Sequence, residues 1–105
     1  MAFYLVQAKS RPAVLDELCE ALQADAFADV KPFGPSMAAS LAQARVDADG
    51  VVWWEEECYC SPPLDAERAH TLDRHFESIE VNAMEQGEAW ERIAKLPYLF
   101  PSLNE

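Results

Sequence analysis

The hydrophobic positions in the first part of the chain change from a strand-like pattern to a helical spacing. The run Phe3–Ala8 is short, apolar and rich in aromatic and branched residues, which predicts a buried strand. Apolar side chains then recur at helical spacing, at Leu15, Leu18, Cys19 and Leu22. This spacing predicts an amphipathic helix, and Pro12 suits its first turn.

A β-hairpin is predicted in the middle of the chain. Residues 25–36 contain prolines and a glycine and are interpreted as an irregular crossover loop. Asp49-Gly50 then separates two apolar runs, Leu41–Val46 and Val51–Tyr59. An Asp-Gly pair between two such runs is a strong hairpin signal.

The expected register of this hairpin decides which side chains share a face. Pairing Val46 with Val51 puts Trp53 and Glu55 on the face of Val46. A helix over residues 36–46, which their alanines favour, is the alternative to the first strand of the hairpin.

A second helix and a further strand are predicted after the hairpin. Ser61-Pro62-Pro63 ends the second hairpin strand, and Ser61 is the expected N-cap of the helix that follows. The apolar stripe of that helix consists of Ala69, Leu72 and Phe76. The alternation over residues 79–84 predicts a strand with Ile79, Val81 and Ala83 facing inward. Continuation of the helix through this stretch is the alternative.

The chain ends with a predicted helix and an apolar tail. Gly87 precedes a helix that Pro97 ends. The apolar side chains of that helix are Trp90, Ile93 and Ala94. The tail Tyr98–Leu103 either packs against the domain or is offered to a partner.

The predicted order is strand, helix, hairpin, helix, strand, with a C-terminal helix and extended apolar tail. This is the order of an α+β ferredoxin-like βαββαβ sandwich, an antiparallel sheet with helices on one face and the other face left open. No repeat or linker divides the sequence, so residues 1–105 are expected to form a single domain. A fold of this kind hosts many unrelated activities and does not name one.

Charge and composition exclude several classes of function. The chain has 19 acidic and 8 basic side chains, for a net charge of −11, and is 50% hydrophobic, so it is expected to fold. Its negative potential opposes binding to nucleic acid and to anionic membranes. No stretch is apolar enough to span a bilayer, and the start lacks the pattern of a secretory signal, so a cytoplasmic protein with reduced thiols is expected.

The most unusual segment of the sequence follows the hairpin turn. Three consecutive glutamates, Glu55 to Glu57, stand in a predicted strand between Trp53-Trp54 and Cys58-Tyr59-Cys60. Alternation brings at least one of these carboxylates toward the covered face. If Glu55 faces inward, it needs a partner or a raised pKa, because an isolated charge is costly in an apolar environment.

This segment has three interpretations. In the first, the glutamates protect an exposed strand and have no chemical role. In the second, they belong to a binding surface for a basic or amine-bearing ligand or for a protein partner. In the third, Cys58 and Cys60 bind a soft metal ion or carry redox chemistry, since both thiolates reach the same side.

The leading hypothesis is a non-catalytic binding or protein-interaction module that forms a homo-oligomer. No catalytic residue, metal ligand or cofactor is assigned. The expected ligand or partner surface consists of Trp54, Glu55, Glu56, Glu57 and Tyr59, with Tyr98, Leu99 and Phe100 as a second candidate. The main alternative is a small enzyme with Glu55 or Glu57 as general base, assisted by Cys58 or His75. His70 is expected to be solvated and Cys19 to lie in the core.

Overall fold

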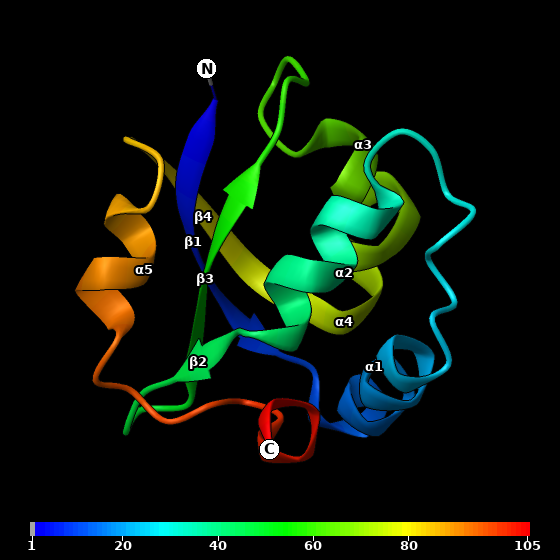
Figure 1. The fold of residues 1–105 in the computed structure, drawn as a ribbon, viewed down its shortest axis with the longest axis vertical. Helices are drawn as coiled ribbons and strands as arrows, with labels where there is room; N and C mark the ends of the chain where they lie inside the picture. Colours follow the sequence, from blue (N-terminus) through cyan, green and yellow to red (C-terminus); the bar gives the residue numbers. More distant parts are fainter. Residues whose placement is uncertain (1) are drawn as a thin grey trace.

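A four-stranded antiparallel sheet runs through the middle of the molecule (Figure 1). The computed structural model describes residues 2–105. The strands are β1 (Phe3–Ser10), β2 (Arg45–Val46), β3 (Val51–Glu57) and β4 (Phe76–Met84). Their order in the sheet is β2-β3-β1-β4, so β1 is paired on both sides.

Helices connect the strands and follow the last of them. The helical elements are α1 (Pro12–Gln23), α2 (Gly34–Ala42), α3 (Asp65–Glu67), the π-helical turn η1 (Arg68–Leu72), α4 (Asp73–His75), α5 (Glu88–Ile93) and the 3₁₀ turn η2 (Pro101–Asn104). α3, η1 and α4 succeed one another without a break and carry the chain from β3 to β4. None of the helices in residues 2–105 is long and apolar enough to cross a membrane.

The α+β class and the ferredoxin-like arrangement predicted from the sequence are confirmed. The connection from β1 to β2 passes over β3, and the connection from β3 to β4 passes over β1. These are the two interleaved crossovers of a split βαβ fold.

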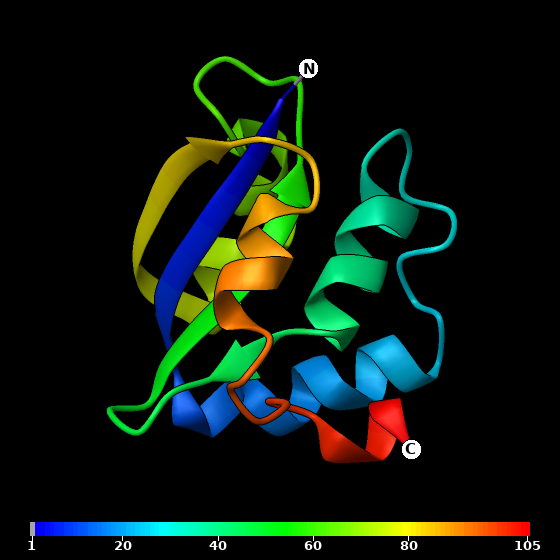
Figure 2. The ribbon, with the colours of Figure 1, turned by 60° about the vertical axis from the view of Figure 1, so that its left-hand side comes forward.

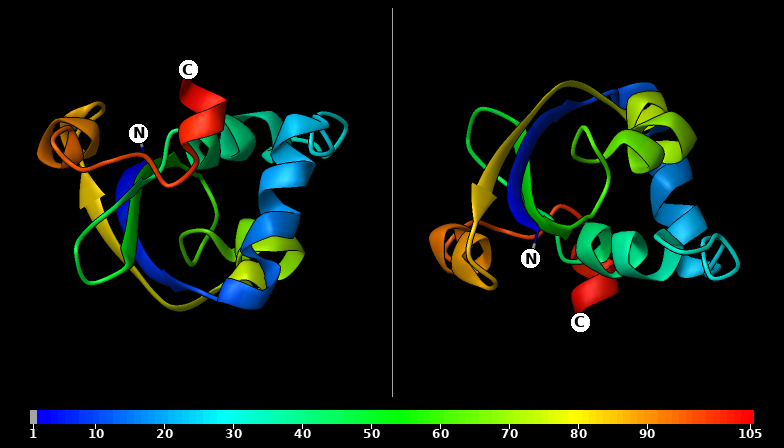
Figure 3. Two further views of the ribbon diagram at one scale, coloured as in Figure 1. Left: turned by 90° about the horizontal axis from the view of Figure 1, so that it is seen from below. Right: turned by 90° about the horizontal axis from the view of Figure 1, so that it is seen from above.

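Side chains of the central strands alternate between two apolar clusters. Val6, Val52 and Trp54 face the larger cluster, beneath α1, α2 and the α3–α4 segment. Leu5 faces the other side of the sheet, where it packs with Ala89 and Ile93 of α5. Figures 2 and 3 show α5 on the side of the sheet away from α1 and α2. The face predicted to be open is therefore partly covered by α5.

The hairpin differs from the prediction in its first strand and in its register. Residues 34–42 form α2 instead of a strand from residue 41, because Pro35 suits a helix start and Met37 and Leu41 bury one helical face. Val46 pairs with Val52, one residue beyond the predicted partner. The backbone N–H of Asp47 donates to the carbonyl oxygen of Val51 at 3.0 Å, so the turn spans residues 48–50 and ends with Gly50, whose φ of 82° lies in the left-handed region.

The helix after the hairpin also begins later than predicted. The helix begins at Asp65, so its N-cap position is Leu64 and not Ser61. The π-helical turn then changes which side chains face the core: Ala69 is exposed, whereas Leu72 and Phe76 are buried. Phe76 is no longer helical and begins β4.

The strand predicted over residues 79–84 is confirmed and is longer than expected, because it begins at Phe76. Ile79 and Val81 pack against the larger cluster, as the alternation predicts. Ala83 is exposed, although it pairs with Tyr4 of β1.

The C-terminal tail packs against the domain. The backbone N–H of Leu99 donates to the carbonyl oxygen of Ala44 at 2.8 Å, and Phe100 is buried in the larger cluster. The guanidinium of Arg45 lies 3.8 Å from the ring centroid of Tyr98. Of the two interpretations of the tail, packing against the domain is the one observed.

A close backbone contact at the start of α2 gives the first testable prediction. A Cβ on Gly34 would lie 2.2 Å from the carbonyl oxygen of Phe27 and 2.8 Å from Cβ of Val30. We expect Gly34→Ala to lower the unfolding free energy by about 2 kcal/mol in urea denaturation, although alanine has the better helix propensity. Ser36→Ala, at an exposed position of the same helix, should change it by less than about 0.5 kcal/mol. Equal stability of Gly34→Ala and the wild type would contradict this expectation.

Candidate functional site

The three glutamates of β3 lie in three different environments. Glu55 faces α5 and is 5% exposed. Its two carboxylate oxygens accept the backbone N–H groups of Gly87 and Ala89, each at 3.1 Å. These donors belong to the start of α5, where helix N–H groups lack internal partners. Glu55 therefore has the partner that the sequence required of it, and it ties α5 to the sheet.

Glu56 faces the larger cluster and is fully buried. Its Oε1 accepts the indole N–H of Trp54 at 2.8 Å, while Oε2 has no hydrogen-bond partner. Burial is the main reason that the pKa of this carboxyl is raised to about 8; the hydrogen bond from Trp54 acts against the rise, and the negative charge of Glu67 contributes to it. Glu56 is accordingly mostly protonated at neutral pH.

Glu57, the last residue of β3, is exposed at the end of the sheet. Its Oε2 accepts the hydroxyl of Tyr59 at 2.6 Å, a bond that raises the pKa of this tyrosine. The side chain of Tyr59 is 68% exposed and is the only large hydrophobic side chain exposed in residues 2–105.

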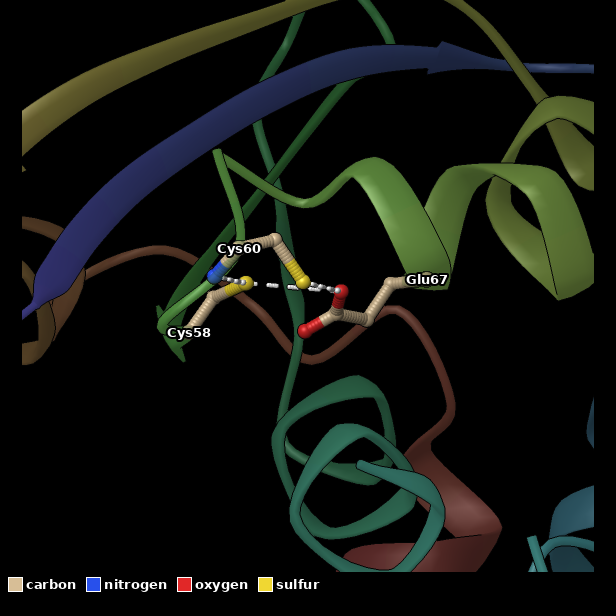
Figure 4. A group of neighbouring side chains, drawn as sticks. All are labelled: Cys58, Cys60 and Glu67. Atoms are coloured by element: carbon tan, nitrogen blue, oxygen red, sulfur yellow. Dashed lines mark hydrogen bonds between the residues drawn. The ribbon is translucent and has the colours of Figure 1, made fainter. Parts of the chain in front are cut away.

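Two thiols and a carboxylate meet just beyond the end of β3 (Figure 4). Cys58 and Cys60 each place Sγ 3.4 Å from Oε1 of Glu67, which comes from α3. The sulfur of Cys58 also accepts the backbone N–H of Cys60 at 3.2 Å and that of Leu64 at 3.3 Å. The donor atoms of the three side chains lie within 4.8 Å of one another.

The Cys58 thiol is held in its protonated form in this arrangement. Burial, together with the side-chain hydrogen bonds with Cys60 and Glu67 that favour the thiol, raises its pKa to about 12. The two backbone N–H groups on the sulfur act in the opposite direction. Since the thiolate is the nucleophile, Cys58 is unreactive at neutral pH unless a cation approaches it.

A cleft of about 520 Å³ opens beside these residues. It is formed by the loop before α2, the end of β3 and the start of the α3–α4 segment. Its lining residues are Pro32, Phe33, Ser36, Glu57, Cys58, Tyr59, Cys60, Ala66 and Glu67. The lining includes two carboxylates and no basic side chain.

The carboxylate of Glu67 is buried without a cationic partner among residues 2–105. Glu67 is 1% exposed, and none of the three ion pairs in this part of the chain includes it. Its observed hydrogen-bond donors are the two thiols. A buried charge is costly unless it is paired, so a cation at this position would be favoured.

The structure does not bring the eight predicted surface residues together. Glu57 and Tyr59 line the cleft. The side chains of Trp54, Glu55 and Glu56 are buried inside the domain instead of forming a surface. The tail residues Tyr98, Leu99 and Phe100 lie beside β2 and α2 and do not line the cleft.

The residues of the predicted enzymatic alternative are only partly brought together. Glu57 and Cys58 both line the cleft, but Glu55 and His75 do not. Glu55 lies on the α5 face, whereas Cys58 lies on the face covered by α2 and α3. His75 is buried and its Nδ1 is 3.0 Å from the carbonyl oxygen of Thr71. His70 is exposed, with its Nδ1 2.7 Å from the hydroxyl of Thr71, and Cys19 is half-buried against the larger cluster.

Glu67 is the functional side chain that sequence reasoning missed. In the sequence it is one of the acidic residues after Pro63, a position typical of a solvated helix start. Leu64 has a left-handed φ of 67°, and the α3 turn that follows carries Glu67 inward. Neither feature has a signal in the spacing of apolar residues.

Comparisons with known proteins assign no function to this chain. No protein-family model matches it, no curated protein is significantly similar, and no solved structure is a significant match.

The raised pKa of Glu56 predicts how stability depends on pH. In the unfolded chain the carboxyl has its ordinary pKa near 4.5, whereas in the fold it is about 8. The stabilisation is therefore complete below pH 4.5 and is lost as the pH rises through about 8, by at most about 1.4 kcal/mol per pH unit. We expect Glu56→Gln, which keeps an acceptor for Trp54, to remove this decline in unfolding free energy measured by urea denaturation between pH 5 and 8.

The exposed neighbour Glu57 supplies the control for this measurement. Glu57→Gln should leave the pH dependence of the wild type unchanged, because its side chain is in solvent. An identical pH slope in Glu56→Gln and the wild type would show that Glu56 does not stay protonated on folding.

Proposed function

We propose that this chain is a non-catalytic binding module whose cleft at the end of β3 holds a small ligand carrying a positive charge. The observation that carries the proposal is the buried carboxylate of Glu67, which faces a cleft of about 520 Å³ and is joined to no basic side chain in residues 2–105. A ligand cation would supply the missing partner.

The size and walls of the cleft support a small-molecule ligand. Small-molecule sites commonly occupy about 300 to 1,000 Å³ and combine apolar walls with a few polar groups. The apolar walls here are Pro32, Phe33, Tyr59 and Ala66. Two of them are aromatic rings, which attract cations through their faces. The net charge of −11 also raises the local concentration of cations around the protein.

Binding is favoured over catalysis by the state of the side chains in this region. The Cys58 thiol has its pKa raised to about 12, which disfavours nucleophilic attack. Glu55 is occupied by two backbone N–H groups and is not among the residues that line the cleft. These features support a module that holds its ligand without transforming it.

An oligomer or a protein partner has less support than a small ligand. α5 covers part of the sheet face that suggested an oligomer, and the tail packs against its own domain. Tyr59, the exposed aromatic residue, stands at the cleft and is the residue through which we would place a partner contact. The three cysteines are free thiols, which suits the proposed cytoplasmic location.

A pair of matched probes tests the proposal. Benzylammonium combines an aromatic ring with a positive charge, and benzyl alcohol is its neutral counterpart. In NMR titrations we expect benzylammonium to shift the resonances of Phe33, Tyr59 and Ala66, and to bind more weakly as ionic strength rises. Benzyl alcohol should bind much more weakly, because it lacks the charge.

Two tryptophan variants supply the structural control. Ala66→Trp fills the cleft and should abolish the shifts, whereas Ala13→Trp, at an exposed position of α1, should retain them. Equal affinity for the two probes, or unchanged binding in Ala66→Trp, would refute a cation-binding cleft.

A further inference from the structure

The floor of the cleft presents the donor atoms of a metal site. Cys58 and Cys60 come from the segment after β3 and Glu67 comes from α3, so two separate elements of the fold supply the ligands. The three donor atoms lie within 4.8 Å of one another, and both sulfur–oxygen distances are 3.4 Å. Figure 4 shows the side chains of Cys58, Cys60 and Glu67 converging on one point.

These distances can be compared with those of a tetrahedral zinc site. Zinc binds thiolate sulfur at about 2.3 Å and carboxylate oxygen at about 2.0 to 2.2 Å. Tetrahedral angles then place two sulfurs about 3.8 Å apart and each sulfur about 3.6 Å from the oxygen. The observed sulfur–oxygen distances of 3.4 Å differ little from this value, so small side-chain rotations suffice to enclose an ion.

We propose that the positive charge held in the cleft is a thiophilic divalent metal ion, represented by Zn²⁺, bound by Sγ of Cys58, Sγ of Cys60 and a carboxylate oxygen of Glu67. This inference rests on the proposed function, because it identifies the cation that the cleft takes. The fourth coordination position faces the cleft, where water or a donor group of a second molecule completes the site.

Binding exchanges protons for the metal in a balanced step. Both S–H bonds break and their protons pass to solvent, while two metal–sulfur bonds and one metal–oxygen bond form. The ion contributes two positive charges, and the two thiolates and the carboxylate contribute three negative ones, so the loaded site carries a charge of −1. The carboxylate of Glu67 thereby gains the cationic partner that residues 2–105 do not supply.

The backbone around Cys58 is already arranged for a thiolate. Its sulfur accepts the N–H groups of Cys60 and Leu64, at 3.2 and 3.3 Å. Such donors to a ligating sulfur orient it and stabilise its negative charge, as outer partners do in metal sites.

The donor set indicates which metals fit. Thiolates select zinc and other soft or borderline ions over Mg²⁺ and Ca²⁺, which prefer oxygen ligands. Three protein ligands with an open position differ from the four of a closed structural zinc site. The open position faces a cleft with Phe33 and Tyr59 in its walls, which suits a metal that anchors a further small molecule.

Titration of the reduced full-length chain with Co²⁺ tests the inference, because cobalt reports thiolate ligation by a sulfur-to-metal charge-transfer band. We expect one ion per chain, a band that Zn²⁺ displaces, and a rise in the melting temperature with ZnCl₂. Cys60→Ser should abolish the band, and Glu67→Gln should weaken binding by about tenfold or more.

Matched variants at other positions control for general effects of substitution. Cys19→Ser removes the one cysteine outside the cleft, and Glu20→Gln removes an exposed carboxylate of α1 that does not line the cleft; both should retain the band. Because Cys58 is buried and its substitution risks unfolding, half-buried Cys60 carries the test, with folding of each variant verified by circular dichroism.

The outcomes separate this inference from the proposed function. Absence of the cobalt band, or its persistence in Cys60→Ser and Glu67→Gln alike, would overturn the metal site. If benzylammonium still binds in that case, the cation-binding cleft stands without a metal. If neither the metal nor benzylammonium binds, both proposals fail.

Discussion

Strand β3 is covered on both of its faces, and this constraint decides what each of its three glutamates can do. A buried carboxylate must accept hydrogen bonds, keep its proton or reach solvent. Glu55 accepts two N–H groups of α5, Glu56 keeps its proton, and Glu57 reaches solvent because the strand ends there. The acidic run that looked like a surface in the sequence is therefore mostly an interior feature, in which Glu55 ties α5 to the sheet.

The burial of β3 on both of its faces also determines where the cleft lies. Along the face covered by the helices, Trp54, Glu56 and Cys58 follow one another at two-residue intervals. After Glu57 the chain leaves the sheet, so the thiols of Cys58 and Cys60 meet the α3–α4 segment where no strand continues. Glu67 from that segment closes the group. Because the covered strand ends beneath a helix, two thiols and a carboxylate lie at the floor of a cleft whose walls are largely apolar.

The sequence predicts the elements of this fold better than it predicts the geometry between them. β1, α1 and β4 follow from apolar spacing, because each buries a regular set of side chains. The hairpin register does not, since it depends on a turn over residues 48–50 that ends with left-handed Gly50, and apolar spacing does not record this turn. In the site, the segment containing Cys58 and Cys60 stands out in the sequence. Glu67 and Phe33 reach it only through a backbone turn and a loop crossing, which tertiary packing determines.

The solvated and the buried acidic side chains of this protein differ in whether they need a partner. Most of the 19 acidic side chains are solvated, where repulsion is screened and no partner is needed. Beneath the helices, Glu56 and Glu67 are both buried, and the charge of Glu67 helps to keep Glu56 protonated. The carboxylate of Glu67 thus lies at the cleft floor, beside the thiols of Cys58 and Cys60. Glu56 is protonated, whereas Glu67 faces the cleft and has no basic partner among residues 2–105. Such a site is electrostatically suited to a positive ligand.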